Sequence, residues 1–219
     1  MAKDRATDIN KRAFLTNLGG MSALAMLAQI MGPAANPALT VLAAQRPTTG
    51  GDVAFLNEAI KLEQQAINTY EAALRNDLIK DPRLNDTATD FVVDHTYHRD
   101  AISRLVRTKF NTSPIVIEKL GTFPIPKEVL NGKDADVLRY ALTLEVIASK
   151  LYFEAINGKL ATDEAKDLIT SICAVENMHV AAYRTALLVV LKDKGLPEDK
   201  QIVPFSFFDQ QPMPQIPNA

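Results

Sequence analysis

The sequence predicts an all-α protein built as a four-helix bundle with one long crossover between the second and third helices. Four segments carry apolar residues at the three- and four-residue spacing of helices that bury one face. Short connections join the first segment to the second and the third to the fourth, whereas a stretch containing prolines and glycines separates the two pairs. Such connectivity is typical of a bundle with one crossover.

The composition supports this class and excludes others. The chain has 219 residues and a net charge of −2, which suits one domain with a tail and gives no basic surplus for binding nucleic acid. Trp is absent and aromatic residues make up 6% of the chain, so a core of Ala, Leu, Ile and Val is favoured over a β-sandwich. The single cysteine, Cys173, excludes an internal disulfide framework and is expected to be a buried small side chain.

Residues 1–45 are expected to be an export signal. Four basic residues within the first 12 positions precede an apolar run, Leu18–Met31, which is short for a membrane span but matches the apolar region of a signal peptide. Small residues follow, with cleavage expected near Ala43 or Ala44. The segment Asn10–Thr16 resembles a twin-arginine export motif with a lysine in place of the first arginine.

This signal predicts an exported protein, located in the periplasm or outside a bacterial cell, that meets a membrane only through its signal. A retained hydrophobic anchor or an interfacial helix is the alternative.

The first helix pair follows a flexible joint at 46–51. A helix is expected over 52–76, with Asp52 as its cap. The dipeptide Asp81-Pro82 marks a turn, and a second helix is expected over 86–109.

The second pair begins after the crossover. The third helix is expected over 135–157 and is ended by Gly158 in the left-handed conformation. Thr162 is expected to cap the fourth helix, which continues to about Lys194. The expected division of the chain is a signal at 1–45, a bundle at 52–197 and a tail at 198–219, whose apolar patch at Val203–Phe208 is expected to pack against the bundle.

The two helix pairs share a spacing that indicates a duplicated hairpin. In the first and third helices a glutamate is followed seven residues later by a tyrosine. The offset between the two glutamates is 82 residues, and the offset between histidines of the second and fourth helices is 81. Packing about a pseudo-twofold axis would place four residues at a similar depth: Glu63, His98, Glu145 and His179.

Burial makes these residues candidate metal ligands. Glu145 lies on an apolar stripe, and an ionised carboxylate facing a core is costly unless it is paired or binds a metal. Glu176 and His179 form a Glu-x-x-His motif, which places a carboxylate and an imidazole on one side of a helix. Two alternatives stay open: Glu63 or Glu145 lies on a solvated outer face, or the glutamates and histidines form a buried hydrogen-bond network without metal.

On these residues the chain resembles the ferritin-like superfamily of di-iron and di-manganese carboxylate proteins, in which two helices each supply a glutamate and two others each supply Glu-x-x-His. Within it the chain looks most like exported ferritin-like domains, including desiccation- and stress-related proteins, over about residues 53–194. The resemblance implies a ferritin-like bundle holding two divalent metal ions, most readily iron, with manganese or zinc as alternatives. The implied site residues are Glu63, His95, His98, Glu145, Glu176 and His179.

The second helix departs from the family pattern, because His95 stands where the glutamate of Glu-x-x-His is expected. Either His95 is a direct ligand, or Asp94 is the ligand and His95 lies behind it; the spacing to His98 favours His95. Three carboxylates leave a pair of divalent ions one charge more positive than four would. A mononuclear or mixed site is therefore a further alternative, and zinc, copper or iron would suit it about equally.

The resemblance implies redox chemistry with O2 or peroxide at a dinuclear iron or manganese site, either Fe(II) oxidation or peroxide removal. Glu63 and Glu145 would be terminal ligands and Glu176 a bridge. Tyr70 and Tyr152 are expected either to hydrogen-bond to ligands or to be core residues. The alternative function is a non-catalytic metal-binding or structural stress-protective bundle; a homo-oligomer is compatible with either.

Overall fold

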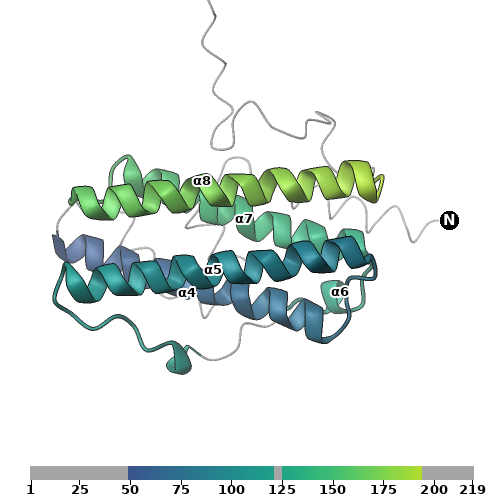
Figure 1. The fold of residues 1–219 in the computed structure, drawn as a ribbon, viewed down its shortest axis with the longest axis horizontal. Coiled ribbons are helices and arrows are strands. Elements are labelled where there is room, and N and C mark those ends of the chain that lie inside the picture. The colour runs from purple at the N-terminus through teal and green to yellow at the C-terminus, as the bar shows by residue number, and fades with distance from the viewer. Residues whose placement is uncertain (1–48, 121–124, 194–219) are drawn as a thin grey trace, which may run out of the picture.

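The computed structural model describes residues 49–120 and 125–193, in which four long helices lie side by side as a bundle (Figure 1). No strand occurs in these residues, so the all-α prediction is confirmed. A π-helix, η3 (Ala186–Val190), continues the last helix. The long helices are α4 (Thr49–Arg75), α5 (Pro82–Thr108), α7 (Asp134–Ile156) and α8 (Asp163–Thr185).

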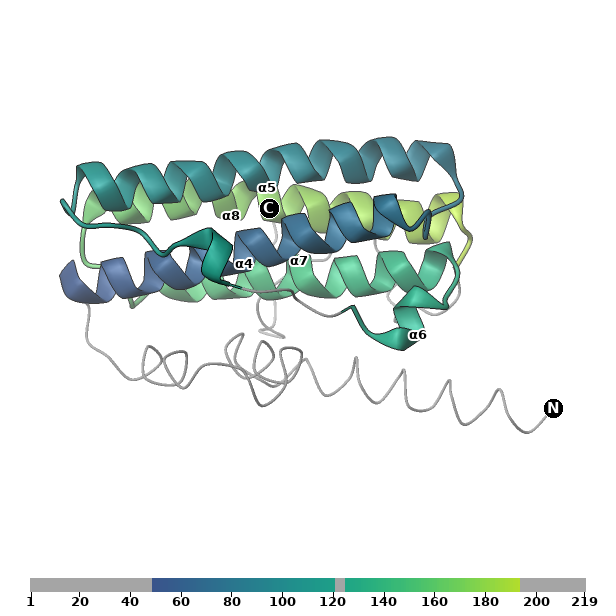
Figure 2. The ribbon, with the colours of Figure 1, turned by 90° about the horizontal axis from the view of Figure 1, so that it is seen from below.

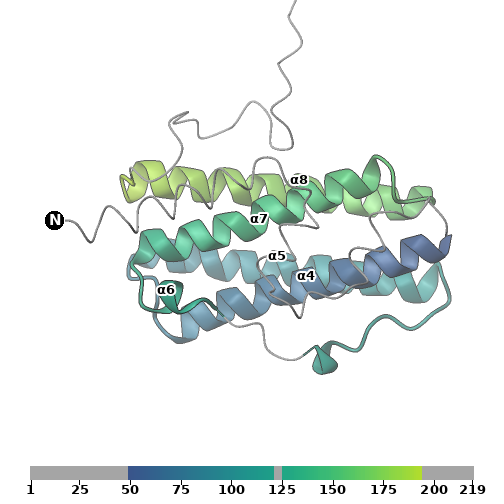
Figure 3. The same cartoon turned by 180° about the vertical axis from the view of Figure 1, so that it is seen from behind.

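The long helices form two antiparallel hairpins, α4 with α5 and α7 with α8. The crossover between them carries a 3-10 helix, η2 (Ile117–Lys119), and a short helix, α6 (Lys127–Leu130). Figures 2 and 3 show that α5 ends at one end of the bundle while α6 lies at the other, where α7 begins. The predicted long crossover between the second and third long helices is therefore confirmed.

The second long helix begins earlier than the sequence predicts. Pro82 is its first residue rather than part of a preceding turn, and Asp81 is the N-cap, whose side chain accepts a hydrogen bond from the Arg83 N–H at 3.0 Å. Proline suits this position because its missing N–H would have no helical partner there.

Asp52 does not cap α4, as the sequence predicted, because the helix already begins at Thr49. Its carboxylate is fully buried and reaches the connection between α7 and α8. It accepts hydrogen bonds from the N–H of Ala161 (2.7 Å), the N–H of Thr162 (2.9 Å) and the Thr162 hydroxyl (2.7 Å). Thr162 is the N-cap residue of α8, as predicted, but its side chain makes no capping bond. Asp52 instead ties the two hairpins together.

We expect Asp52→Ala to lower the free energy of unfolding by about 3 kcal/mol, because three donors lose a charged, buried acceptor. Chemical denaturation followed by circular dichroism measures this loss. Asp52→Asn keeps one acceptor oxygen in the same place and should lose about half as much. A loss below about 1 kcal/mol in the alanine variant would mean that this tie contributes little.

The third long helix ends within one residue of its prediction, but not by the predicted conformation. Gly158 has no left-handed φ; the N–H of Asn157, the C-cap of α7, bonds instead to the Phe153 carbonyl oxygen at 3.1 Å. The fourth helix ends before Lys194: the π-helix η3 follows α8, and Lys192 has a φ of 51° just beyond it. The left-handed conformation at Lys192 stops the helix where no glycine marks an end.

Two apolar clusters fill the bundle, one on each side of a polar layer. The first includes Phe55, Ile102 and Leu151, and the second includes Phe91, Leu138 and Leu187. Cys173 is a buried member of the first cluster, as predicted, and burial raises the pKa of its thiol to about 11.

No helix among the described residues combines the length and apolar character needed to cross a membrane. The predicted signal at 1–45, the tail at 198–219 and the apolar patch at Val203–Phe208 lie outside the described residues.

Candidate metal centre

The polar layer is made by six side chains that come from all four long helices, and each is at most 8% exposed. An exposure of 1% for both Glu63 and Glu145 excludes the solvated outer face as an alternative for either. The structure thus brings together every site residue that the sequence analysis named: Glu63 on α4, His95 and His98 on α5, Glu145 on α7, and Glu176 and His179 on α8.

One group of four residues has its ligand atoms within 4.8 Å of one another: Glu63, His95, His98 and Glu176. His95 Nδ1 lies 2.8 Å from Glu63 Oε2. His98 Nδ1 lies 2.9 Å from Glu176 Oε1 and 3.5 Å from Glu63 Oε2. Two carboxylates and two imidazoles therefore converge on one point.

A second group meets the same criterion: His95, Glu145, Glu176 and His179. His95 Nε2 lies 3.2 Å from Glu145 Oε1, and His179 Nδ1 lies 3.4 Å from Glu145 Oε2 and 3.6 Å from Glu176 Oε2. His95 and Glu176 belong to both groups. Each presents one of its two polar atoms to each group, so these two residues lie between the two positions.

Asp94 lies outside the cluster and is 45% exposed at its side chain. Its Oδ2 is 3.1 Å from Nε2 of His179, the ring nitrogen that faces away from Glu145. The structure therefore places His95 within the cluster and Asp94 behind His179. The sequence located Asp94 near this face, but it gave no signal for a contact between residues 85 positions apart.

Two tyrosines brace the glutamates across the bundle. The Tyr70 hydroxyl on α4 donates to Oε1 of Glu145 on α7, and the Tyr152 hydroxyl on α7 donates to Oε1 of Glu63 on α4. Each tyrosine thus binds the glutamate of the other hairpin, as the repeat in the sequence would give for a pseudo-twofold arrangement. Burial and the neighbouring carboxylates raise the pKa of both hydroxyls well above the usual value, so both remain donors.

We expect Tyr152→Phe to lower the free energy of unfolding of the metal-free protein by about 1 to 3 kcal/mol, because Oε1 of Glu63 loses its donor in a buried place. Tyr97, which is 70% exposed, provides the matched control, and Tyr97→Phe should leave stability unchanged. Urea denaturation in the presence of a chelator measures both. Equal stabilities of the two variants would contradict a bracing role for Tyr152.

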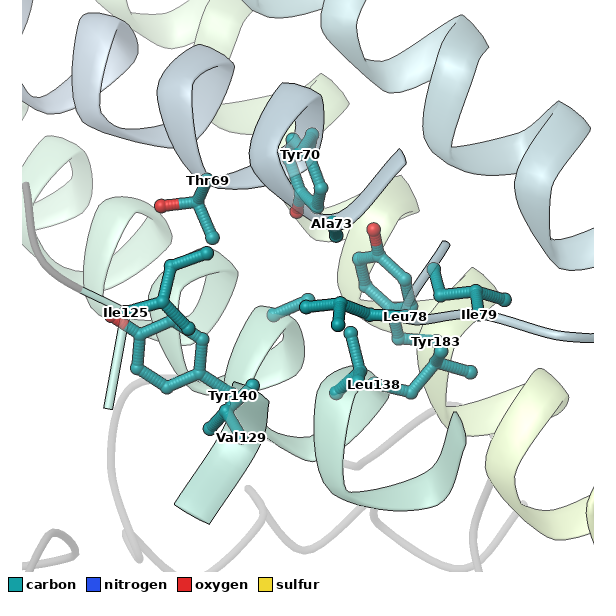
Figure 4. Close-up of a pocket in the computed structure, with 12 residues that line it drawn as sticks. Thr69, Tyr70, Ala73, Leu78, Ile79, Ile125, Val129, Leu138, Tyr140 and Tyr183 are labelled. Atoms are coloured by element: carbon teal, nitrogen blue, oxygen red, sulfur yellow. The ribbon is translucent and has the colours of Figure 1, made fainter. Parts of the chain in front are cut away.

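An apolar pocket lies beyond Tyr70, toward α6 (Figure 4). The rings of Tyr70 and Tyr183 stack there with centroids 6.2 Å apart, and Ile125 and Val129 of the crossover line the same space. None of its twelve lining residues carries a charge, so this pocket adds no ligand to the cluster.

Opposite charges decide the protonation of the histidines. Burial opposes a charge on His98, but Glu176 and Glu63 outweigh it and raise the His98 pKa to about 9. Burial acts on His179 in the same way, and Glu145 and Glu176 raise its pKa to about 10. The pKa of His95 is raised well above its usual value by the same carboxylates against the opposing effect of burial.

The pKa values of two glutamates shift in opposite directions, downward for Glu63 and upward for Glu176. Burial by itself would raise the pKa of Glu63, yet contacts with His95 and His98 lower it to about 2. For Glu176, burial and the Glu63 and Glu145 carboxylates outweigh the attraction of His95 and raise its pKa to about 7. Protons on imidazoles thus balance most of the carboxylate charge at neutral pH, and any cation must replace them.

The cluster fits metal ions by a further criterion. Both oxygens of Glu176 and Nδ1 of His98 are buried and lack a hydrogen bond of normal geometry within the part of the chain that the structure describes. Such unpartnered groups are rare and costly in a core. A cation between them would satisfy both at once, and carboxylate with imidazole donors suits iron, manganese and zinc.

Fold and cluster together define an all-α four-helix bundle with a buried histidine and glutamate centre that could hold a metal ion. The sequence model of the ferritin-like domain matches residues 51–189, and the chain belongs to this family. The family predicted from the sequence is therefore confirmed. A search among curated proteins found no match.

Proposed function

We propose that the protein binds two divalent metal ions at this cluster and uses them for oxidation chemistry, either Fe(II) oxidation or the removal of peroxide. The observation that carries the proposal is Glu176, whose two buried oxygens face different groups, Oε1 at 2.9 Å from His98 and Oε2 at 3.6 Å from His179, without a hydrogen bond of normal geometry among the described residues. Iron is the proposed metal, with manganese or zinc as alternatives, because carboxylate and imidazole donors bind all three. Membership of the ferritin-like domain family supports this choice.

In this proposal each ion has two ligands of its own. Glu63 and His98 would hold one, whereas Glu145 and His179 would hold the other. Glu176 would serve both through its two oxygens, and His95 would serve one of them, because a neutral imidazole has one free nitrogen lone pair. Bound iron or manganese would supply the redox chemistry by exchanging electrons with dioxygen or peroxide.

The chain's own groups orient these ligands. Tyr70 and Tyr152 hold Oε1 of Glu145 and Oε1 of Glu63, and Oε2 of each glutamate faces a histidine. Oε1 of Glu145 also lies 3.2 Å from Nε2 of His95. Asp94 contacts the outer nitrogen of His179 and so fixes the ring with Nδ1 toward the cluster. Partners of this kind set the orientation and basicity of metal-binding imidazoles.

A second candidate function is metal binding without turnover. It is favoured by the origin of the ligands, because ions bound by side chains from all four long helices would hold the two hairpins together.

Elemental analysis of the purified full chain tests metal binding, with two ions per chain expected. Adding Fe(II) to metal-free protein in air then separates the two candidates. Dioxygen consumption or peroxide loss above that of the Glu176→Gln variant supports oxidation chemistry, whereas bound ions without either support the second candidate. A protein that binds no metal overturns both.

We also propose that the protein is exported to the periplasm or beyond, supported by the basic residues and apolar run of residues 1–45. Cell fractionation and N-terminal sequencing of the mature protein test this. A chain in the cytoplasm that still begins at its original N-terminus would contradict it.

A further inference from the structure

The repeat that relates the two hairpins also relates the two proposed metal positions. An offset of 81 residues takes His98 to His179, and an offset of 82 takes Glu63 to Glu145. We call the place between Glu63 and His98 the first-hairpin position, and the place between Glu145 and His179 the second-hairpin position. The side chains around the two positions depart from this symmetry in three ways.

A carboxylate lies behind the histidine of the second-hairpin position. Oδ2 of Asp94 is 3.1 Å from Nε2 of His179, the outer nitrogen of that ring. The residue 81 positions after Asp94 is Val175, so the repeat gives His98 no equivalent carboxylate. A carboxylate in this place orients a metal-binding imidazole and makes it a stronger ligand.

A positive charge lies beside the first-hairpin position. Arg99 directly follows the histidine of that position, and its Nη1 donates to Oε1 of Gln64, which directly follows the glutamate, at 2.8 Å. Asp100 pairs with Arg99 at 2.8 Å, but its side chain is 53% exposed, so water screens this pair and the guanidinium charge is only partly offset. The residue equivalent to Arg99 in the second hairpin is Val180, a member of the apolar core. A guanidinium repels a divalent cation, so this difference also favours the second-hairpin position.

The proton on His95 gives the third difference. Nδ1 of His95 lies 2.8 Å from Oε2 of Glu63. Nε2 lies 3.2 Å from Oε1 of Glu145, an oxygen that already accepts a hydrogen bond from Tyr70. A neutral imidazole has one N–H, and the shorter contact with Glu63 holds that proton on Nδ1. Nε2 is then free for an ion at the second-hairpin position.

We propose that the two metal positions are unequal and that a divalent ion fills the second-hairpin position first. The inference rests on the proposed metal function and adds the order of binding to it. The carboxylate of Asp94, the guanidinium of Arg99 and the free nitrogen of His95 all favour this order. With one ion bound, Glu63 stays paired, because Tyr152 and His95 donate to its two oxygens. At limiting metal the protein therefore holds a single ion, and the first-hairpin position fills only as the metal concentration rises.

Zinc titration of the metal-free full chain tests this order. Zinc has no redox chemistry, and a chain with three histidines gives a simple imidazole spectrum. NMR of 15N-labelled imidazoles should show His179 and His95 moving to their zinc-bound positions during the first equivalent of zinc, and His98 during the second. Competition with a chelator should give two binding constants that differ by at least about tenfold. Equal constants, or a zinc-bound signal of His98 in the first equivalent, overturn the proposal and leave two-ion binding intact.

Two variants should move the two constants in opposite directions. Asp94→Asn should weaken binding of the first ion about 10- to 100-fold, the usual effect of losing a partner behind a ligand. Val175→Asp supplies the equivalent carboxylate for His98 and should strengthen binding of the second ion about tenfold. Asp90→Asn is the matched control, because Asp90 is an exposed aspartate one turn earlier on α5, and should leave both constants unchanged.

These variants separate the contact with His179 from a general effect of negative charge. An Asp94→Asn protein with an unchanged first constant, or an equal loss in the Asp90→Asn protein, overturns the role of Asp94. Neither result affects the proposed function, which requires only that two ions bind. A chain that binds no zinc, iron or manganese overturns both proposals.

Discussion

Glu176→Gln is expected to remove both metal ions, whereas His98→Ala and His179→Ala are each expected to remove one. Glu176 is the only carboxylate that belongs to both groups, with Oε1 2.9 Å from His98 and Oε2 3.6 Å from His179. Glutamine keeps the shape of the side chain, but it carries no charge and replaces one oxygen by an amide group that cannot bind a cation. Mutation of a residue that only orients a metal ligand typically lowers metal affinity about 10- to 100-fold. Because Glu176 is itself a proposed ligand of both ions, we expect its loss to lower the affinity for each ion by more than about 100-fold.

Competition with a chelator of known affinity measures the two binding constants in each variant. Glu71→Gln is the matched control, since Glu71 is an exposed glutamate on α4 that pairs with Arg75 and lies outside the cluster. It should bind two ions with unchanged affinity. A Glu176→Gln protein that still binds two ions as tightly as the original would show that the cluster is not the metal site.

The helices and the cluster could be predicted because their signals lie within single segments. An apolar stripe identifies the buried face of a helix, and spacings such as that from Glu176 to His179 place two side chains on that face. Glu145 among apolar neighbours predicted burial in the same way, and the structure has it 1% exposed. The nearly equal offsets between the two helix pairs then predicted that the site residues of all four helices lie at a similar depth in the bundle.

The contacts that the sequence did not predict join separate segments. Asp52 reaches Thr162 across 110 positions, so this partner is not visible in the local pattern. A hydrogen bond from Tyr152 to a ligand was one of two expectations, but the local pattern did not show that the ligand is Glu63, 89 positions away. Aspartate is a common N-cap residue and Asp52 lies near a helix start, so the sequence favoured the prediction that it caps α4, which was wrong. The end of the helical segment formed by α8 and η3 was missed for another reason: Lys192, just beyond η3, takes a left-handed conformation without being glycine.

Opposite pH dependences of stability are expected with and without metal. A group whose pKa is higher in the folded than in the unfolded protein binds its proton more tightly when folded. His98 and His179, with pKa values raised from 6.5 to about 9 and about 10, therefore stabilise the metal-free fold fully below pH 6.5. This contribution falls as the pH rises toward 9 and 10.

Glu176 acts in the same direction at lower pH, because its raised pKa of about 7 makes the fold lose stability as the pH rises from 4.5 to 7. Glu63, with a pKa lowered to about 2, contributes stability above pH 4.5 that is lost only as the pH falls toward 2. Metal-free protein should therefore be most stable near pH 4.5, because the contribution of Glu176 falls above this pH and that of Glu63 falls below it. Between pH 6 and 8 it should lose of the order of 2 kcal/mol for each of the two histidines.

Metal reverses this trend. Each ion must displace protons from the imidazoles that bind it, so metal affinity rises by about a factor of ten per pH unit for each proton released. Tighter binding to the folded state alone adds to its stability. Urea denaturation at pH 6 and pH 8, in a chelator and in excess zinc, should show stability falling with pH in the first case and rising in the second. Parallel trends in the two conditions would mean that the zinc does not replace the protons on His98 and His179.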